Sequence, residues 1–250
     1  MGWVAVTKAE LLERSGQDPF VACELAADAP GLASEFGWAV TTVDALGRAS
    51  AFAVLDGADG AGGAELLVAL EKLMAERGWR LCWVICETHI DLPLGDHWQR
   101  GGRWVWMSAT QITPDDTGWS LVELDDDADA EELRAFALPI NPIWEGDPGL
   151  GRNRFWLGAR DAAATLIGCG TVHETSAGIG PLAGLVVDPA YRNQGLGRAL
   201  VIGLSQRVLA ADGITTLSAY ADNSSAISVY ERVGYRLNHR FHSRFIEPRR

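Results

Sequence analysis

Apolar positions in the second half of the chain switch between two periods. Residues 182–187 form a short apolar run closed by Asp-Pro, which is typical of a buried strand and its exit turn. Further on, one face of an amphipathic helix is marked by four apolar residues at a spacing of four, Leu196, Leu200, Leu204 and Val208. Two glycines stand in the segment between the two patterns, residues 192–197. The order predicts a strand, a glycine-bearing loop and a helix.

The predicted loop has the chemistry of an anion site. The first N–H groups of a helix have no partner inside that helix, and its positive end attracts negative charge. Arg192 and Arg198 add positive charge on either side. Phosphate binding is therefore one interpretation, and a glycine that only permits a tight turn is the other. No Gly-Lys-Ser/Thr follows, and Leu200 stands where a dinucleotide fingerprint has its third glycine, so neither of those two motifs fits.

A second strand and helix follow at once. Residues 215–221 favour a strand, and Asn223 is a good N-cap for a helix that carries Tyr230 on its apolar side. Gly234 stands where a glycine commonly ends a helix. The two strand–helix pairs in sequence are more specific than either alone.

From about Trp119 to its C-terminal end, the chain resembles the GNAT superfamily of acetyl-CoA-dependent N-acetyltransferases. The residues that carry the resemblance are Arg192, Gly195 and Gly197 in the pyrophosphate loop, Asn223 and Tyr230 in the second cofactor motif, and Gly234-Tyr235 opening the next strand. The resemblance implies acetyl-CoA as cosubstrate. It also implies the cofactor-binding residues, which are Leu185, Val186, Val187, Arg192, Asn193, Gln194, Gly195, Leu196, Gly197, Arg198 and Asn223.

The same resemblance suggests catalytic roles. Backbone groups of residues 185–187 would pair with the pantetheine arm and polarise the thioester carbonyl, and Tyr230 would protonate the departing thiolate. A core tyrosine is the alternative for Tyr230. His173 and Glu174, at a strand end, are the best candidates for the general base, with a water chain as the other possibility; His239 and His242 are weaker candidates.

The first half repeats the loop pattern in a weaker form. Residues 59–64 follow an apolar strand and precede a helical stripe, and Gly62 stands 133 residues before Gly195. Residues 98–102 parallel residues 230–234 at an offset of 132. The two offsets suggest an internal duplication, with chance similarity as the alternative. Asp59 would place a carboxylate beside the pyrophosphate, and Asp91 begins a poor match to the Asn223 motif, so we expect this copy to bind no cofactor and to lack part of its leading helices.

A turn-rich stretch, residues 113–118, separates the halves. We expect a degenerate GNAT-like domain at 1–117, structural or substrate-shaping, and a catalytic acetyl-CoA-binding domain at 118–250. Each is expected to be an α/β domain with a mixed, mostly antiparallel sheet flanked by helices. In the second domain, a helical segment over 125–137 should be stopped by Pro139.

Composition narrows the function classes. The net charge is −12, and residues 1–118 carry 8 lysines and arginines against 17 carboxylates, which argues against nucleic acid as a partner. Four cysteines show no CxxC pair and no His/Cys cluster, so no metal is expected and reduced thiols in a cytoplasm fit best. No membrane association is predicted. The leading function is acetyl transfer to a primary amine, on a small molecule or a peptide N-terminus, by a monomer or homodimer; the alternative is a non-catalytic acyl-CoA-binding module.

Overall fold

The computed structural model describes residues 2–43, 47–56, 62–90 and 92–246, and its contacts divide the chain into two compact units. Unit 1 comprises Met1–Trp106, Tyr220–Asp222 and Asn238–Arg250, and unit 2 comprises Met107–Ala219 and Asn223–Leu237. The units thus differ from the expected ranges 1–117 and 118–250, above all because the C-terminal strand contributes to unit 1. The two expected domains stay a prediction.

Unit 1 begins with a strand, two helices and three further strands. Its described elements are β1 (Val4–Val6), α1 (Lys8–Arg14), α2 (Pro19–Glu24), β2 (Gly31–Ser34), β3 (Gly37–Val43), β4 (Arg48–Leu55), α3 (Gly63–Arg77), β5 (Arg80–Glu87), most of β6 (Gln99–Ala109) and most of β12 (Arg236–Phe245). A capping box starts α1, since Thr7 and Glu10 each accept a hydrogen bond from the other's backbone N–H. We expected this half to lack part of its leading helices; the structure has two helices, α1 and α2, before β2.

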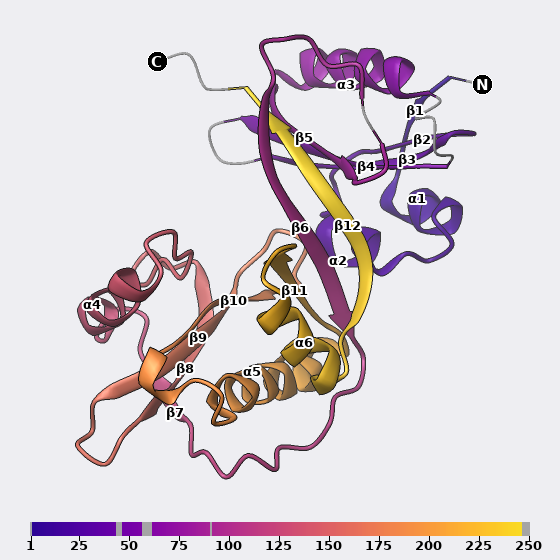
Figure 1. The fold of residues 1–250 in the computed structure, drawn as a ribbon. Helices are drawn as coiled ribbons and strands as arrows, with labels where there is room; N and C mark the ends of the chain where they lie inside the picture. Colours follow the sequence, from indigo (N-terminus) through magenta and orange to yellow (C-terminus); the bar gives the residue numbers. More distant parts are fainter. Residues whose placement is uncertain (1, 44–46, 57–61, 91, 247–250) are drawn as a thin grey trace. The chain divides into compact units, whose positions relative to one another are not determined.

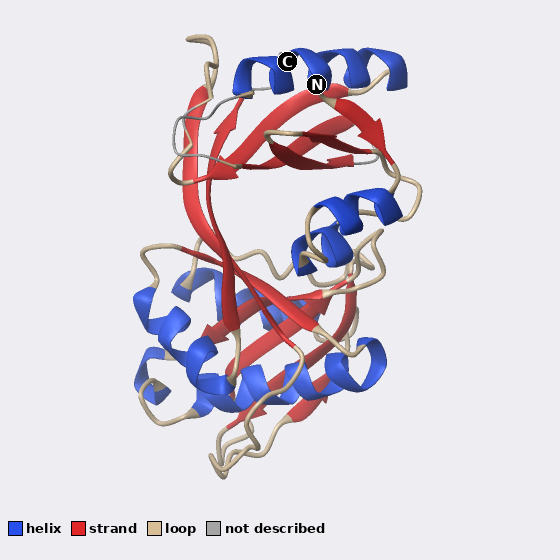
Figure 2. Ribbon diagram, turned by 90° about the vertical axis from the view of Figure 1, so that its right-hand side faces the viewer, coloured by secondary structure: helices blue, strands red, loops and turns tan. Residues whose placement is uncertain are grey.

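The sheet of unit 1 has the strand order β1-β2-β3-β4-β5-β12-β6. β4 and β5 are parallel, whereas β1–β2, β2–β3, β3–β4 and β5–β12 are antiparallel. Figure 1 shows α3 on one face of this sheet and α1 and α2 on the other, and Figure 2 shows the same layers after a quarter turn. The sheet is therefore covered on both faces.

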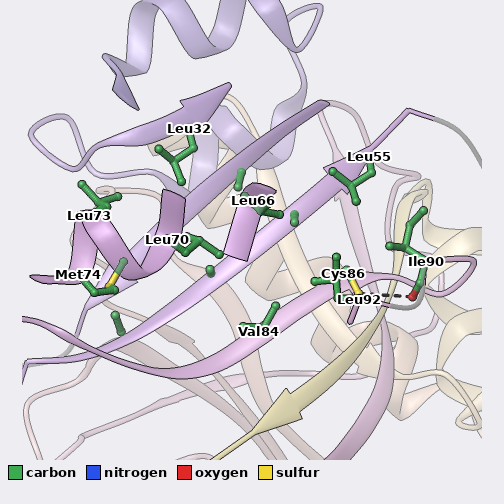
Figure 3. Close-up of a cluster of buried hydrophobic side chains, with 14 residues drawn as sticks. Leu32, Leu55, Leu66, Leu70, Leu73, Met74, Val84, Cys86, Ile90 and Leu92 are labelled. Carbon is green, nitrogen blue, oxygen red and sulfur yellow. Dashed lines mark hydrogen bonds between the residues drawn. The ribbon is translucent and has the colours of Figure 1, made fainter. Parts of the chain in front are cut away.

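Two different cores lie on these faces. Beneath α3, Leu66, Leu70 and Met74 pack on aliphatic residues of the sheet and on Cys86, whose thiol lies 3.6 Å from the carbonyl oxygen of Ile90 (Figure 3). The opposite face is aromatic. There the rings of Phe20 and Phe241 lie 5.3 Å apart between their centroids. The helical stripe expected in this half, residues 66–74, is confirmed by α3.

Unit 2 contains the predicted strand–loop–helix sequence. Its elements are β7 (Val122–Leu124), α4 (Ala130–Ile140), β8 (Asn153–Arg160), β9 (Leu166–His173), β10 (Pro181–Val187), the 3-10 helix η1 (Pro189–Tyr191), α5 (Leu196–Asp212), β11 (Thr215–Tyr220, its last residue in unit 1) and α6 (Ser224–Val233). The strand order is β11-β10-β9-β8-β7, with β10 and β11 parallel and the other pairs antiparallel.

The helices of unit 2 cover opposite faces of its sheet. Cys169 packs with Leu133 of α4, whereas a side chain at Gly168 or Gly170 would meet leucines of α5. All four apolar positions of the predicted stripe on α5 are buried. Adjacent strand residues point to opposite faces, so β9 has to place its glycines under α5 and its cysteine under α4.

The expected α/β class, a mixed and mostly antiparallel sheet flanked by helices, is confirmed in each unit, with two local corrections. α4 continues through Pro139 to Ile140, because a proline in the last turn removes only one backbone hydrogen bond. Residues 98–102, expected to match the end of a helix, instead lead into β6. The four cysteines are buried and free of disulfides, and no described helix is long and apolar enough to cross a membrane. Asp59 and Asp91 lie outside the described residues.

Candidate acyl-CoA site

The parallel strands β10 and β11 of unit 2 separate soon after they begin. Their register contains two pairs, Pro181 with Thr216 and Leu182 with Leu217. On its other edge, β10 stays paired with β9 as far as Val187, with a register shift between Ala183 and Val186. β10 thus keeps one neighbour along its whole length and loses the other after Leu182. The backbone groups on that edge beyond Leu182 are open to a ligand.

A bulge at Gly184 accompanies this separation. Gly184 has φ +60°, and its carbonyl oxygen accepts a hydrogen bond from the indole nitrogen of Trp144 at 2.8 Å. A side chain at Gly184 would lie 3.0 Å from the backbone of Gly146, so the segment after α4 packs directly on the bulge. That segment is held by Asn153, whose amide nitrogen donates to the carbonyl oxygens of Gly146 and Asp147 at 3.0 and 3.2 Å.

The predicted glycine loop follows β10 and is held by its own hydrogen bonds. Asp188 accepts from the backbone N–H of Ala190 at 2.7 Å, as the cap of η1, and the side-chain amide of Gln194 donates to the Ala190 carbonyl at 2.9 Å. Asn193 and Gly195 both have positive φ, of 61° and 85°. Asn tolerates this region better than most residues, and glycine enters it without strain. Gly195 is then the N-cap of α5.

Space is left over the loop. An added side chain at Gly195 would come no closer than 3.6 Å to Thr117, and one at Gly197 no closer than 3.7 Å to Val187. These are ordinary contact distances, so the glycines leave room for a group to approach the backbone. The first N–H groups of α5 point out of this end, since no side chain caps the helix. The loop therefore leaves open space beside uncapped backbone N–H groups, which is the setting in which helix N-termini bind anions.

The two flanking arginines are engaged differently. Arg192 is exposed, and its Nε donates to the Val187 carbonyl at 3.3 Å. Arg198 forms an ion pair with Asp116, so an anion would have to share it. A contact that the sequence did not indicate comes from Trp119, whose indole nitrogen donates to the Gln194 carbonyl at 2.8 Å. Neither Trp119 nor Trp144 belongs to a recognisable motif. Each donates a hydrogen bond to a backbone carbonyl oxygen that is remote in sequence, Gln194 and Gly184 respectively.

Tyr230 and Tyr235 form a buried pair in unit 2, with ring centroids 6.1 Å apart. Burial raises the pKa of each to about 12. The Tyr235 hydroxyl bonds Ser205 at 2.7 Å and Thr215 at 2.9 Å, whereas within the described chain the Tyr230 hydroxyl has no hydrogen-bond partner. Tyr230 therefore keeps its proton and has it available for a ligand. The other α6 candidate, Asn223, caps the helix by accepting from the Ala226 N–H at 3.2 Å.

His173 and Glu174 lie at the end of β9, beside the start of β10. The His173 Nε2 is 2.9 Å from the Glu145 carbonyl oxygen, which can only accept, so Nε2 carries the proton and Nδ1 can receive one. Burial lowers the pKa of His173, although the Glu145 carbonyl and nearby carboxylates favour the charged form. Glu174 is exposed and lies 3.9 Å from the Arg154 guanidinium.

The structure arranges the predicted residues in three groups. The predicted cofactor residues other than Asn223 form one continuous path along the end of β10, the loop and the start of α5. Asn223 and Tyr230 are both on α6. His173 and Glu174 sit at the opposite end of β10 from the loop, where β10 and β11 are still paired. Among the described residues, no cluster of His, Cys, Asp or Glu could hold a metal ion.

In unit 1 the corresponding glycine at the helix start, Gly62, is covered. Gly62, the N-cap of α3, has φ 82° and ψ −2°, against 85° and −8° at Gly195. An added side chain at Gly62 would lie 2.6 Å from the Phe36 ring, and its carbonyl oxygen accepts from the indole nitrogen of Trp3 at 2.9 Å. The backbone turn is the same, but an aromatic side chain occupies the space above it.

Known proteins share this architecture. Residues 115–235 match the model of the acetyltransferase (GNAT) family. A mycothiol acetyltransferase of Streptomyces avermitilis is 43% identical over 84 residues, which cover 32% of this chain and 26% of that relative. The aligned part is thus about a quarter of the relative's length.

Two solved structures extend the likeness over the whole chain. An acetyltransferase of the GNAT family from Colwellia psychrerythraea aligns with a TM-score of 0.54 at 12% identity, covering 99% of this chain and 100% of that one. A GCN5-related N-acetyltransferase from Sphaerobacter thermophilus aligns with a TM-score of 0.52 at 17% identity, covering 97% and 94%. At such identities these likenesses concern the fold. Residues 115–235, nearly half of the chain, thus belong to the acetyltransferase (GNAT) family.

Proposed function

We propose that this chain is an N-acetyltransferase that transfers an acetyl group from acetyl-CoA to a primary amine. The observation that carries the proposal is the separation of β10 from β11 after Leu182, next to an uncovered glycine loop at the start of α5. An open strand edge and an anion site in succession suit a ligand with an amide-bearing arm and a pyrophosphate.

The chain's own groups would hold that ligand in two places. The loop N–H groups and Arg192 would bind the pyrophosphate, and the open backbone edge at Leu185–Val187 would pair with the amides of the arm. Acetyl-CoA supplies an acyl group that its thioester has already activated, so the protein needs no covalent intermediate. What remains for the protein is to orient the amine and move two protons.

Tyr230 is the candidate acid. Its raised pKa keeps the phenol protonated at neutral pH, and its hydroxyl is not committed to another described side chain. It would donate a proton to the departing thiolate. The transfer leaves a phenolate on Tyr230, and because the conjugate phenol has a pKa of about 12, that phenolate regains a proton from water at neutral pH.

His173 is the candidate base, and it is better placed for this role than Glu174. The hydrogen bond to Glu145 holds the proton on Nε2, and the lowered pKa keeps Nδ1 unprotonated at neutral pH. It would accept the proton of the attacking amine directly or through water. Glu174 is exposed beside Arg154, which favours a solvated carboxylate with little tendency to take up a proton.

The test compares the two tyrosines of the buried pair. Tyr230→Phe is expected to lower kcat about a hundredfold or more, as loss of a general acid does, with little change in the Kd of acetyl-CoA. Tyr235→Phe is the matched control, since it removes an equally buried hydroxyl that is already bonded to Ser205 and Thr215. It should cost about 1 kcal/mol of stability and leave kcat nearly unchanged.

The assay is release of free thiol from acetyl-CoA with a panel of amines, and calorimetry gives the Kd. Unchanged turnover in Tyr230→Phe would remove Tyr230 from the mechanism. Binding of acetyl-CoA without thiol release for any amine would instead favour a non-catalytic acyl-CoA-binding module.

A further inference from the structure

Unit 1 has a small polar pocket far along the chain from the loop at Gly62. It has a volume of about 210 Å³ and lies at the end of β5, between the first residues of β6 and the last residues of β12. Its described lining includes five basic side chains, Arg100, Arg103, Arg244, His89 and His242. No carboxylate belongs to that described lining.

The positive charge of this pocket contrasts with the acidic composition of the first half of the chain. Residues 1–118 carry 8 lysines and arginines against 17 carboxylates, and two of those eight cations line this one pocket. The side chains of Arg100 and Arg103 form no ion pair with any described residue, and His89 lies 3.9 Å from the carboxylate of Glu87. The guanidinium groups of Arg100 and Arg103, which line the same pocket, repel each other, and an anion would relieve that repulsion.

His242 is oriented by the surrounding backbone. Its Nε2 is 2.6 Å from the Ile90 carbonyl oxygen, which accepts the proton on that nitrogen. Nδ1 is then the ring atom left for a further hydrogen bond. Ser243, the next residue, donates to the Gly102 carbonyl at 3.2 Å and so ties β12 to the start of β6. The pocket is built on paired strands rather than on a free loop.

A difference between the two units accounts for its position. In unit 2 the chain enters α6 soon after β11 ends. In unit 1 the described part of residues 88–98, which follows β5, contains no helix. Thr88, His89 and Ile90 therefore border a pocket at the place in the chain order where the other unit starts a helix.

We propose that this pocket binds the phosphate group of a small molecule. Arginine guanidinium groups match phosphate oxygens in geometry and charge, and three of them with two imidazoles suit a dianion better than a single carboxylate. At 210 Å³ the pocket is below the usual range of about 300–1,000 Å³ for a whole ligand, so it fits one charged group. The proposal is independent of the acetyl transfer proposed for unit 2.

The experiment is a calorimetric titration with inorganic phosphate at low ionic strength. The double variant Arg100→Gln/Arg103→Gln should bind phosphate about tenfold or more weakly than the unchanged chain, because it loses two charge-assisted contacts. Arg236→Gln is the matched control, since Arg236 is exposed at the other end of β12 and lines no part of the pocket. Thermal unfolding checks that each variant is folded.

The same titration with acetate separates phosphate from carboxylate recognition. Weaker binding of acetate than of phosphate supports the assignment, and equal or tighter binding overturns it. Inorganic phosphate can also occupy the loop at Gly195, but that contribution is common to all three proteins. The proposal fails if the double variant binds like the unchanged chain, if Arg236→Gln loses as much affinity, or if the unchanged chain binds no phosphate in the millimolar range.

Discussion

Each unit contains two parallel strands connected by a helix, β4 and β5 in unit 1 and β10 and β11 in unit 2, and the two pairs differ in how far they stay hydrogen-bonded. In unit 1, β4 and β5 stay paired over six residue pairs, from Arg48 with Arg80 to Ala53 with Cys86, with one register shift between Ala49 and Ser50. In unit 2, β10 and β11 part after two pairs. A paired backbone group is not available to a ligand, whereas an unpaired one needs a partner. The same order of elements therefore produces a closed sheet in one unit and an open strand edge in the other.

The glycines that begin the helices after these strands show a similar contrast between the units. Gly62 and Gly195 have nearly identical backbone angles and each begins a long helix. Phe36 lies against Gly62, while the nearest contact at Gly195 is 3.6 Å away. The backbone conformation is common to both glycines, and a side chain remote in sequence, Phe36, fills the space beside one of them.

The largest expected effect comes from placing a charge on the open loop. Gly195→Asp should weaken acetyl-CoA binding about a thousandfold, because two like charges about 4 Å apart repel by roughly 4 kcal/mol near a protein surface. Calorimetry measures the Kd.

Gly213→Asp is the matched control for this variant. Gly213 also has positive φ and lies at the other end of α5 with no atom within 4 Å of an added side chain. It introduces the same backbone strain and the same charge away from the loop. If both variants lose acetyl-CoA equally, the loop is not the binding site and the contrast between the units disappears.

A second effect should be confined to unit 1 and depend on pH. Burial alone lowers the pKa of His239, but hydrogen bonds to Asp18 and Glu87, each 3.1 Å away, outweigh it and raise the pKa to about 9. Because the pKa of His239 is higher in the folded state than the value of about 6.5 expected in the unfolded state, its protonation contributes fully to the free energy of unfolding below about pH 6.5. That contribution, about 3 kcal/mol, should be lost as pH rises through about 9.

Urea unfolding at pH 6 and pH 9.5 measures this loss. His239→Gln should remove most of the difference between the two pH values, since Gln does not titrate. If the free energy of unfolding of the variant differs as much between the two pH values, another group is responsible. The ion-pair cluster of His239, Asp18 and Glu87 would then not be a distinguishing feature of unit 1.

The smallest effect compares the two glycines directly. Gly62→Ala and Gly195→Ala suffer the same strain at positive φ, about 1 kcal/mol, so their difference isolates the contact with Phe36. The free energy of unfolding of Gly62→Ala should be lower by about a further 2 kcal/mol, because the added methyl group overpacks the site. Equal losses in thermal unfolding would mean that Phe36 moves aside readily and that the loop of unit 1 is not sealed.

Local patterns predicted the elements around the candidate site well. The stripe from Leu196 to Val208 and the cap at Asn223 depend on neighbours in the chain, and both are confirmed. The repeated loop motif at residues 59–64 stays a prediction, because residues 59–61 lie outside the described residues. The residue roles at the site stay predictions. Sequence patterns could not show where β10 leaves β11, because strand separation depends on register and on the bulge that Trp144 holds.

The errors have the same origin. Residues 98–102 match the helix end of the other half in letters, yet they begin a strand that pairs with residues far away in sequence. The sequence also could not predict that Gly62 is covered, because Phe36 and Trp3 contact it from distant parts of the chain. Short motifs report the path of the backbone and say little about which side chains fill the space beside it.

The last strand has a consequence for how the chain is made. In the order of strands in unit 1, β12 lies between β5 and β6, and it brings Phe241 and His239 into the aromatic core. These residues leave the ribosome after nearly all of unit 2. A domain at the N-terminus ordinarily folds first during synthesis. Here the sheet of unit 1 has to wait, with a gap between β5 and β6, for a strand that is translated after nearly all of unit 2.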